Sequence, residues 1–235
     1  MRSFHIGGDE VQFSCWLNNS GVVAFMAAHG MVDASQLQLY FEARVAALGA
    51  LRGKKVLIWE ENAGAKNLYP PNAVVNVWKE AGGNLSVMES LVRDGYTVLY
   101  TTTSWYLDWA GVAGSGRAQI NSADEWQRYH AVDPLGGTTL TPQQQRSVLG
   151  GEVCMWSPME DAANFFPTVF PRAAAVADVL WAAPGARTRE PQALLDRMRA
   201  ARCRLLARGI AAGSVEHAGS CPSTGEQAYK PPYEL

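Results

Sequence analysis

Five short apolar runs constrain the fold of this 235-residue chain more than any other feature. Each run has the length and the Val, Ile and Leu content of a strand that is buried on both faces, and segments of helical length separate the runs. The runs span residues 4–6, 55–59, 73–78, 96–100 and 147–156. Strands that alternate with helices predict an α/β protein with a parallel sheet and helical crossovers.

The segments between and after these runs contain helices with recognisable ends. The predicted helices span residues 21–29, 34–51, 85–93, 171–181 and 191–208. Gly95 is a favourable stop for the third helix, and Pro171 and Pro191 stand in the first turn of the last two, where a missing N–H has no helical partner. The second helix carries five apolar residues at helical spacing, which is typical of an apolar helix face. These are Leu37, Tyr40, Phe41, Val45 and Leu48.

Chemically capable side chains stand directly after the predicted strands. They are an acid pair, four aromatic residues and two further acids: Asp9 and Glu10, Trp59 and Glu61, Trp78, Tyr106 and Asp108, and Trp156. In a β/α barrel these positions converge on the C-terminal face, where active sites lie. A doubly wound sheet would also gather ligands at its strand ends, but the chain has no Gly-rich phosphate loop to favour a nucleotide.

The acid pair follows Gly7 and Gly8 at the end of the first run. Adjacent acids on an extended backbone point in different directions, so Asp9 and Glu10 can hold two roles at one bond. Their surroundings would then have to push their pKa values apart. The alternative is a strand-end turn with solvated acids. His5, just before the glycines, is either a hydrogen-bonded core histidine or a group that tunes one of the two carboxylates.

The aromatic residues after the strands suggest a sugar site. Trp59, Trp78 and Trp156 each end a predicted strand, which favours a shared aromatic box over three separate core residues. The phenol of Tyr106 can donate to a carbonyl oxygen, and Asp108 can accept from a sugar hydroxyl. The alternative for that segment is packing beside a loop acid. We expect Glu61 to support the site, since several acids in one barrel usually pair with Arg or Lys.

Composition excludes several classes of partner and cofactor. The formal net charge of −2 argues against a nucleic-acid surface and against electrostatic binding to a membrane. No apolar run approaches the roughly 18 residues of a membrane-spanning helix. The four cysteines form no Cys-x-x-Cys pair, and no His cluster accompanies them, so we expect no metal site. Cys203 and Cys221 could close a disulfide in an oxidising compartment, and the sequons at Asn18 and Asn84 weakly favour secretion.

Together these motifs resemble glycoside hydrolase family 20, the β-N-acetylhexosaminidases, and most closely the lysosomal-type enzymes of animals and protists. The resemblance extends from residue 4 to residue 221 in the order of the family's motifs. Its blocks are residues 5–11, 15–16, 59–61, 77–79, 105–108, 150–156 and 171–181. So many separate matches are far more specific than the acid pair alone.

The resemblance implies catalysis without an enzyme nucleophile. The 2-acetamido oxygen of the substrate attacks the anomeric carbon, which is an exception to the scheme with two catalytic carboxylates. Glu10 matches the general acid that protonates the glycosidic oxygen and later activates water. Asp9 matches the residue that orients the acetamido group and stabilises the oxazolinium cation. No cofactor or metal is expected.

The resemblance also assigns the binding residues. Tyr106 matches the donor to the acetamido carbonyl, and Asp108 matches a ligand of the outer sugar hydroxyls. Trp59, Trp78 and Trp156 match the walls around the N-acetyl group. The implied partners are N-acetylhexosamine-containing glycans or glycoconjugates, with no nucleic acid and no membrane, and a homodimer is one expected assembly. The implied location is the lysosome or the secretory route.

For the fold, the resemblance implies a partial (β/α)8 TIM barrel, with strands four to eight and their helices. We expect residues 1–221 to be the C-terminal part of that catalytic barrel and residues 222–235 to be a loose tail. The N-terminal barrel half, including an Arg of the first strand, has no counterpart and is expected as a missing partner. The resemblance further implies a disulfide between Cys203 and Cys221, a Cys15 whose family partner lies upstream, and a buried free thiol at Cys154.

Two departures from the family pattern concern the terminal sugar. Pro158 stands where the family usually places a Glu that holds the outer hydroxyls, and Glu160 lies two residues further on. Thr168 and Phe170 replace the usual Arg and Trp. Selectivity between gluco and galacto substrates therefore stays open. The alternative function is a truncated, inactive pseudoenzyme that binds carbohydrate or forms oligomers.

Overall fold

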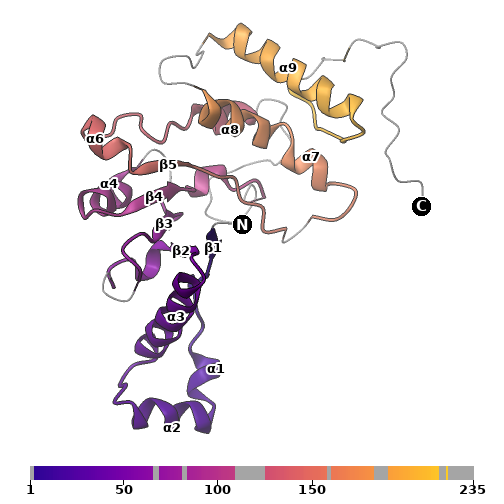
Figure 1. The fold of residues 1–235 in the computed structure, drawn as a ribbon. Helices are drawn as coiled ribbons and strands as arrows, with labels where there is room; N and C mark the ends of the chain where they lie inside the picture. The colour runs from indigo at the N-terminus through magenta and orange to yellow at the C-terminus, as the bar shows by residue number, and fades with distance from the viewer. Residues whose placement is uncertain are drawn as a thin grey trace. The chain divides into compact units, whose positions relative to one another are not determined.

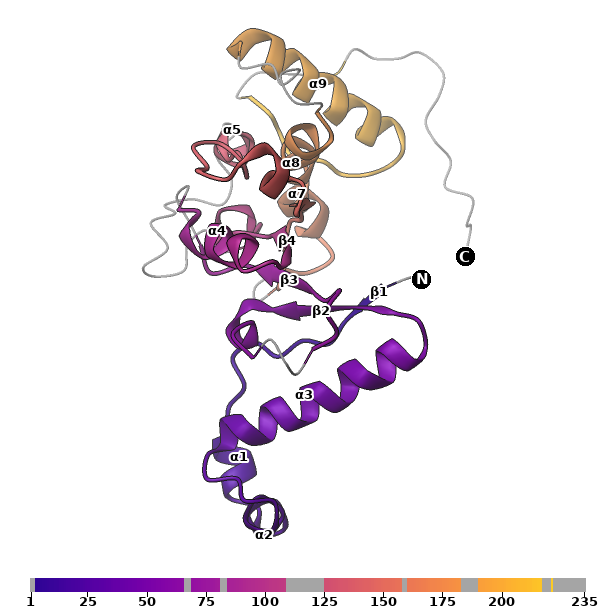
Figure 2. The same ribbon diagram turned by 60° about the vertical axis from the view of Figure 1, so that its left-hand side comes forward.

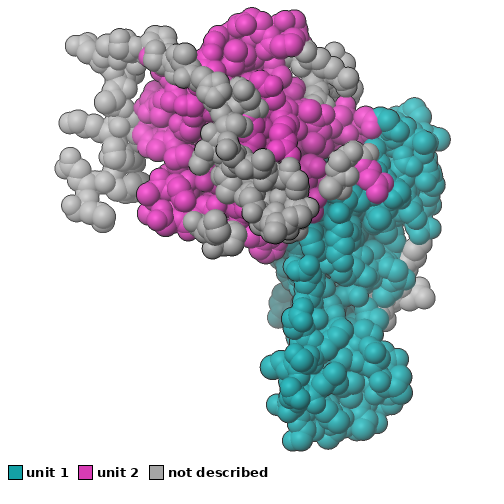
Figure 3. Space-filling model, turned by 180° about the vertical axis from the view of Figure 1, so that it is seen from behind, with its two compact units in different colours: residues 1–80, 85–100, 137–150 teal, residues 81–84, 101–136, 151–235 magenta. Residues whose placement is uncertain are grey.

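The computed structural model describes residues 3–65, 69–80, 84–108, 125–157, 160–182, 190–216 and 221. The chain divides into two compact units, coloured separately in Figure 3. Unit 1 comprises residues 1–80, 85–100 and 137–150, and unit 2 comprises residues 81–84, 101–136 and 151–235. The predicted tail, residues 222–235, lies outside the described residues.

A parallel sheet organises unit 1 (Figure 1). Its strands are β1 (Ser3–His5), β2 (Lys55–Trp59), β3 (Val74–Val77), β4 (Thr97–Tyr100) and β5 (Val148–Gly151). They lie in sequence order, and each neighbouring pair from β1 to β4 is parallel. All four residues of β3 are buried, as expected for a central strand covered on both faces. The predicted α/β class is confirmed.

The fifth strand is shorter than the sequence predicted. It ends at Gly151 instead of reaching Trp156, and Cys154 forms only an isolated parallel bridge with Tyr106. The carboxylate of Asp108 accepts hydrogen bonds from the backbone N–H groups of Trp156 and Ser157. Because a side chain takes these two donors, they are not available to extend a strand ladder.

Helix α3 (Ala34–Leu51) connects β1 to β2, packs against β2 and has the predicted bounds. Asp33 caps its first turn in a capping box with Gln36. The predicted apolar face is not the buried one, since Phe41 and Leu48 are 60% and 53% exposed. Small and polar residues face inward instead: Ala34, Gln38, Glu42, Ala46 and Gly49. A Cβ on Gly49 would lie 2.4 Å from the ring of Phe4, so this stripe lets the helix approach β1 closely.

The described part of unit 1 contains four further α-helices. The helices α1 (Ser14–Leu17) and α2 (Ser20–Ala28) lie at the N-terminal end of α3, away from the sheet (Figure 2). Helix α4 (Ser86–Arg93) packs beside β4 and contacts the short α6 (Pro142–Gln145). The structure confirms the predicted helices at residues 21–29 and 85–93, with ends shifted by a residue. Among the described helices, none combines the length and the hydropathy that crossing a membrane requires.

Unit 2 is largely helical. It contains α5 (Trp126–Ala131), α7 (Phe165–Val169), α8 (Arg172–Trp181) and α9 (Pro191–Ala207). Helix α8 packs against α5, α7 and α9, and its bounds and those of α9 confirm the prediction to within a residue. The buried indole of Trp126 donates to the Val215 carbonyl at 2.8 Å, and that of Trp105 donates to the Tyr129 carbonyl at 3.0 Å.

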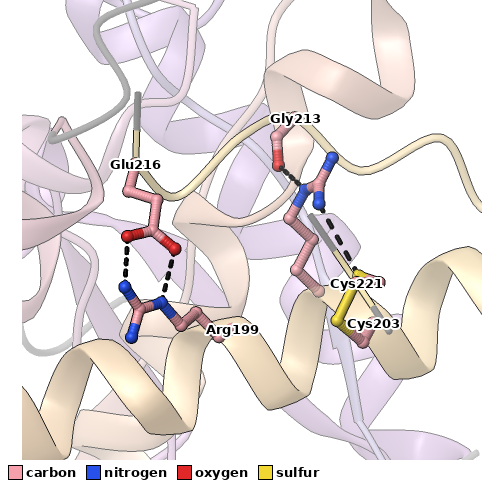
Figure 4. The surroundings of a disulfide bond; sticks show 6 residues. Arg199, Cys203, Gly213, Glu216 and Cys221 are labelled. Carbon is pink, nitrogen blue, oxygen red and sulfur yellow. Dashed lines mark hydrogen bonds and ion pairs between the residues drawn. A yellow bond between two sulfur atoms is a disulfide. The ribbon is translucent and has the colours of Figure 1, made fainter. Parts of the chain in front are cut away.

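The predicted disulfide joins Cys203 of α9 to Cys221, which follows it by 18 residues (Figure 4). The guanidinium of Arg202 donates to the Gly213 carbonyl at 2.9 Å, which ties the returning segment to α9. One turn earlier on the helix, Arg199 pairs with Glu216 through two hydrogen bonds. Cross-links of three kinds therefore hold this segment against α9.

Candidate active site

The acid pair lies on a loop with an unusual backbone just after β1. Gly7 and Gly8 have φ values of +75° and +104°, and Glu10 has a φ of +45°. Glycine adopts positive φ at little cost, but Glu10 carries a Cβ and is strained there. Such strain persists only where the surrounding structure fixes the backbone. Glu10 is exposed, and Asp9 is half-buried.

An aromatic chain runs beside this loop within unit 1. His5 is exposed, so in this chain it is not a core histidine, and its Nδ1 accepts from the Gly7 N–H at 3.0 Å. Its ring lies 4.6 Å from the ring of Trp59, and Trp59 meets Trp78 edge to face at 6.3 Å. The structure thus brings together two of the three predicted tryptophan walls.

Two adjacent acids fix the tryptophan that follows β3. Glu61 accepts from Trp78 Nε1 at 3.1 Å on both carboxylate oxygens, and Lys79 Nζ lies 3.2 Å from Glu61 Oε1. Glu60 accepts the backbone N–H groups of Trp78 and Lys79, each at 3.2 Å. Burial, opposed in part by these two bonds, raises the pKa of Glu60 to about 7. Glu61 thus orients an indole and pairs with a lysine, as a supporting residue would.

A second group of predicted residues lies in unit 2. Asp108 is only 3% exposed, and its Oδ2 accepts from the backbone of Trp156 and Ser157. Its Oδ1 is also buried, yet no group in the described part of the chain donates to it. A buried carboxylate oxygen without a donor costs free energy, so this atom is available to a ligand hydroxyl. The loop that carries Trp156 is held by the same carboxylate.

The two aromatic residues of this group differ in exposure. Tyr106 is 2% exposed, whereas Trp156 is 53% exposed, and their rings lie 6.3 Å apart. The backbone of Cys154, two residues before Trp156, forms a parallel bridge with that of Tyr106. Burial raises the pKa of the Cys154 thiol to about 12, so this half-buried free cysteine stays protonated at neutral pH.

The sequence interpretation missed four residues behind the acid loop. Gln38, Glu42, Asn62 and Tyr69 form a buried hydrogen-bonded group beneath Gly8. One signal was present: Gln38 and Glu42 are polar and four residues apart, so they share a helix face. Pro158, which bears on sugar selectivity, lies outside the described residues, and the half-buried Glu160 has no predicted role to compare with the structure.

Known proteins resemble the chain over most of its length. Residues 1–184 match the model described as the catalytic domain of glycosyl hydrolase family 20. The chain is 33% identical over 220 residues to the human beta-hexosaminidase subunit beta, which covers 92% of this chain and 36% of the relative. The mouse beta-hexosaminidase subunit alpha is 31% identical over 225 residues, with 95% and 40% covered.

A solved structure shows the same fold. The chitobiase of Flavobacterium johnsoniae superimposes with a TM-score of 0.69 and 27% identity, over 88% of this chain and 30% of the chitobiase chain. With the family match, this likeness confirms the predicted partial (β/α)8 barrel. The chain spans between 30% and 40% of the length of these three relatives.

Proposed function

The chain belongs to glycosyl hydrolase family 20, and we propose that its acid pair serves a β-N-acetylhexosaminidase that removes terminal β-linked N-acetylhexosamine from glycans or glycoconjugates. One observation carries the proposal. Glu10 is exposed and has a positive φ on the loop that follows β1, one residue beyond Asp9, which itself follows two glycines with positive φ. Backbone strain of this kind collects at functional sites, and the resemblance of this segment to the family's acid-pair motif supports the same assignment.

The proposed reaction uses the acetamido group of the substrate as its nucleophile. The acetamido oxygen forms a bond to the anomeric carbon while the glycosidic C–O bond breaks, and Glu10 gives its proton to the leaving oxygen. The cation that forms is an oxazolinium ion, whose positive charge Asp9 stabilises. Water then attacks the anomeric carbon while Glu10 takes a proton from that water. The bond between the anomeric carbon and the acetamido oxygen breaks, its electron pair restores the neutral acetamido group, and the sugar leaves with retained configuration.

The remaining predicted residues bind the sugar in this proposal. By their resemblance to the family motifs, Trp59, Trp78 and Trp156 match wall residues of the N-acetyl group, and Tyr106 matches the donor to its carbonyl oxygen. The Oδ1 of Asp108 accepts from an outer hydroxyl, a role that its burial and its missing donor among the described residues support. Such a hydroxyl would satisfy the buried oxygen, which makes the contact worth more than an exposed one.

We also propose that the protein works in the lysosome or outside the cell. The disulfide between Cys203 and Cys221 supports an oxidising route, because reducing cytosol rarely preserves such bonds. Blocking entry into the endoplasmic reticulum in cells that express the protein should leave Cys203 and Cys221 as free thiols in the reducing cytosol, and an intact bond there would contradict the assignment.

Hydrolysis of an aryl N-acetyl-β-glucosaminide tests the proposed reaction. We expect the chain to release the aryl alcohol and Glu10→Gln to abolish turnover, because a glutamine cannot donate the proton. Asp196→Asn is the matched control, since this acid is exposed on α9 and should leave turnover unchanged.

A second substrate tests the nucleophile. The corresponding aryl β-glucoside, which has a 2-hydroxyl in place of the acetamido group, should not be hydrolysed, because it lacks the acetamido oxygen that attacks the anomeric carbon. Equal turnover of both substrates would refute the substrate-assisted route. Binding of N-acetylglucosamine without turnover of either substrate would refute the enzyme and favour a carbohydrate-binding pseudoenzyme.

A further inference from the structure

The carboxylate of Glu42 is buried on the inner face of α3, with only 3% of the residue exposed. Three side chains donate to it. Gln38 Nε2 lies 2.6 Å from Oε1, Asn62 Nδ2 lies 3.0 and 3.1 Å from the two oxygens, and the Tyr69 hydroxyl lies 2.5 Å from Oε2. Burial and the bond to Glu42 raise the pKa of Tyr69, so its phenol keeps the proton that it donates.

The same group holds the backbone that precedes the acid pair. Gln38 Nε2 also donates to the Gly8 carbonyl at 2.8 Å, so one amide bridges the carboxylate and the loop. An amide NH₂ has two hydrogens, and Glu42 and Gly8 use both. Glu42 thereby fixes the orientation in which Gln38 meets the loop.

Gly8 is adapted to this contact. A Cβ on Gly8 would lie 2.7 Å from Glu42 Oε1, and the φ of +104° is one that side chains rarely adopt. The backbone at Gly8 therefore packs against the buried carboxylate more closely than a residue with a Cβ could. One residue beyond Asp9, Glu10 holds its own positive φ of +45°, which requires a backbone fixed from outside.

Stability alone does not require this polar cluster. If Glu42 and its donors were all replaced by apolar side chains of similar size, the desolvation that a buried charge incurs would be avoided. The cluster instead fixes the orientation of its side chains, because four hydrogen bonds to one carboxylate allow only one arrangement of the donors. Fully satisfied polar networks of this kind make a local structure unique and rigid.

We propose that Glu42 is a positioning residue, which acts through Gln38 to fix the Gly8 peptide and so the directions of the Asp9 and Glu10 carboxylates. Its effect on turnover rests on the proposed function, whereas its effect on the loop does not. The two consequences therefore need separate measurements.

Turnover measures the first consequence. In Glu42→Gln, kcat should fall about 10- to 100-fold, because small displacements of catalytic groups have effects of that size. KM should change less than about threefold, since the sugar contacts stay in place. Glu89→Gln is the matched control: Glu89 is also a buried acid of unit 1 that accepts from Thr138, Thr139 and Arg93, and it should leave kcat unchanged.

Coupling separates positioning from general support. If Glu42 acts through Gln38, the double variant Glu42→Gln, Gln38→Met should lose no more kcat than the worse single variant. Additive losses in kcat would overturn the proposed route, as would an equal loss of kcat in Glu89→Gln. Gln38→Met leaves the carboxylate with two donors, so it tests the route even where Glu42→Gln fails to fold.

Amide hydrogen exchange measures the second consequence without any turnover. Exchange in residues 7–10 should be at least about tenfold faster in Glu42→Gln and in Gln38→Met than in the wild type, because the loop loses its fixed contact. Exchange in β3 should not change. Unchanged exchange in residues 7–10 would overturn the proposal. A wild type without turnover would refute the proposed function and still leave the positioning role to be decided by this measurement.

Discussion

Glu42 in unit 1 and Asp108 in unit 2 are both buried carboxylates, each only 3% exposed, and their surroundings differ in one respect. Side chains donate to both oxygens of Glu42. Asp108 has donors on Oδ2 alone, and Oδ1 has none within the described ranges of the chain. A buried acid whose two oxygens both accept hydrogen bonds from the protein has a structural role, whereas one with an oxygen that lacks a donor can accept a hydrogen bond from a ligand.

The largest loss of stability is expected when the acceptor at the centre of the Glu42 cluster is removed. Glu42→Leu leaves one N–H of Gln38 and the Tyr69 hydroxyl buried without their acceptor, and it removes the acceptor of the half-buried Asn62 amide. Each buried unsatisfied group costs about 1–3 kcal/mol. Partial relaxation reduces the sum, so we expect the free energy of unfolding to fall by about 3–5 kcal/mol. Urea unfolding followed by circular dichroism measures this loss. A loss below about 1 kcal/mol would mean that the cluster contributes little.

The second largest effect is expected from Asp108→Asn, which should change sugar affinity more than stability. In Asp108→Asn the amide oxygen can still accept from Trp156 and Ser157, while the amide nitrogen replaces Oδ1 and cannot accept. We expect N-acetylglucosamine to bind about 10- to 100-fold more weakly, because a hydrogen bond to a charged group contributes about 1.5–3 kcal/mol. Calorimetric titration gives the affinity. Stability should fall by less than in Glu42→Leu, and the opposite order would refute the distinction between the two acids.

The two acids also show what the sequence could reveal. The ends of α3 were predictable, because Asp33 with Gln36 forms a local capping signal and Gly53 follows the last turn. The buried face of α3 was not, because five apolar residues outweighed Gln38 and Glu42 in the pattern. The partners that make those polar residues suitable for burial, Asn62 and Tyr69, lie 20 and 27 residues from Glu42.

The same limit applies to the candidate site. Asp108 and Trp156 were both predicted as sugar ligands from their places after strands. Their mutual contact, across 48 residues of sequence, was not predicted, and it gives the Trp156 N–H a side-chain acceptor in place of a neighbouring strand. Local patterns predicted the strands and the candidate residues, whereas contacts between distant segments decided which side chains are buried and how they are fixed.

Glu60 provides an intermediate case, and pH is the variable that tests it. Burial raises its pKa to about 7 from an ordinary value of 4.5, so folding favours its protonated form. Its contribution to stability is fully present below pH 4.5 and is lost as the pH rises through 7. We expect the wild type to lose stability relative to Glu60→Gln over this interval. A difference between the two proteins that does not change with pH, measured by thermal unfolding in matched buffers, would contradict the raised pKa.

The smallest change in stability is expected from the ion pair of Lys79 with Glu61, which is the most exposed of these interactions. The Lys79 side chain is 50% exposed, so water and salt screen its attraction to Glu61. Lys79→Met should lower the free energy of unfolding by about 0–1 kcal/mol, and the loss should shrink further in 1 M salt. The Trp78 indole still donates to Glu61 without the lysine, so sugar affinity should not change. If Lys79→Met lowered the free energy of unfolding as much as Glu42→Leu, the contribution of these carboxylates to stability would not depend on the number and burial of their donors.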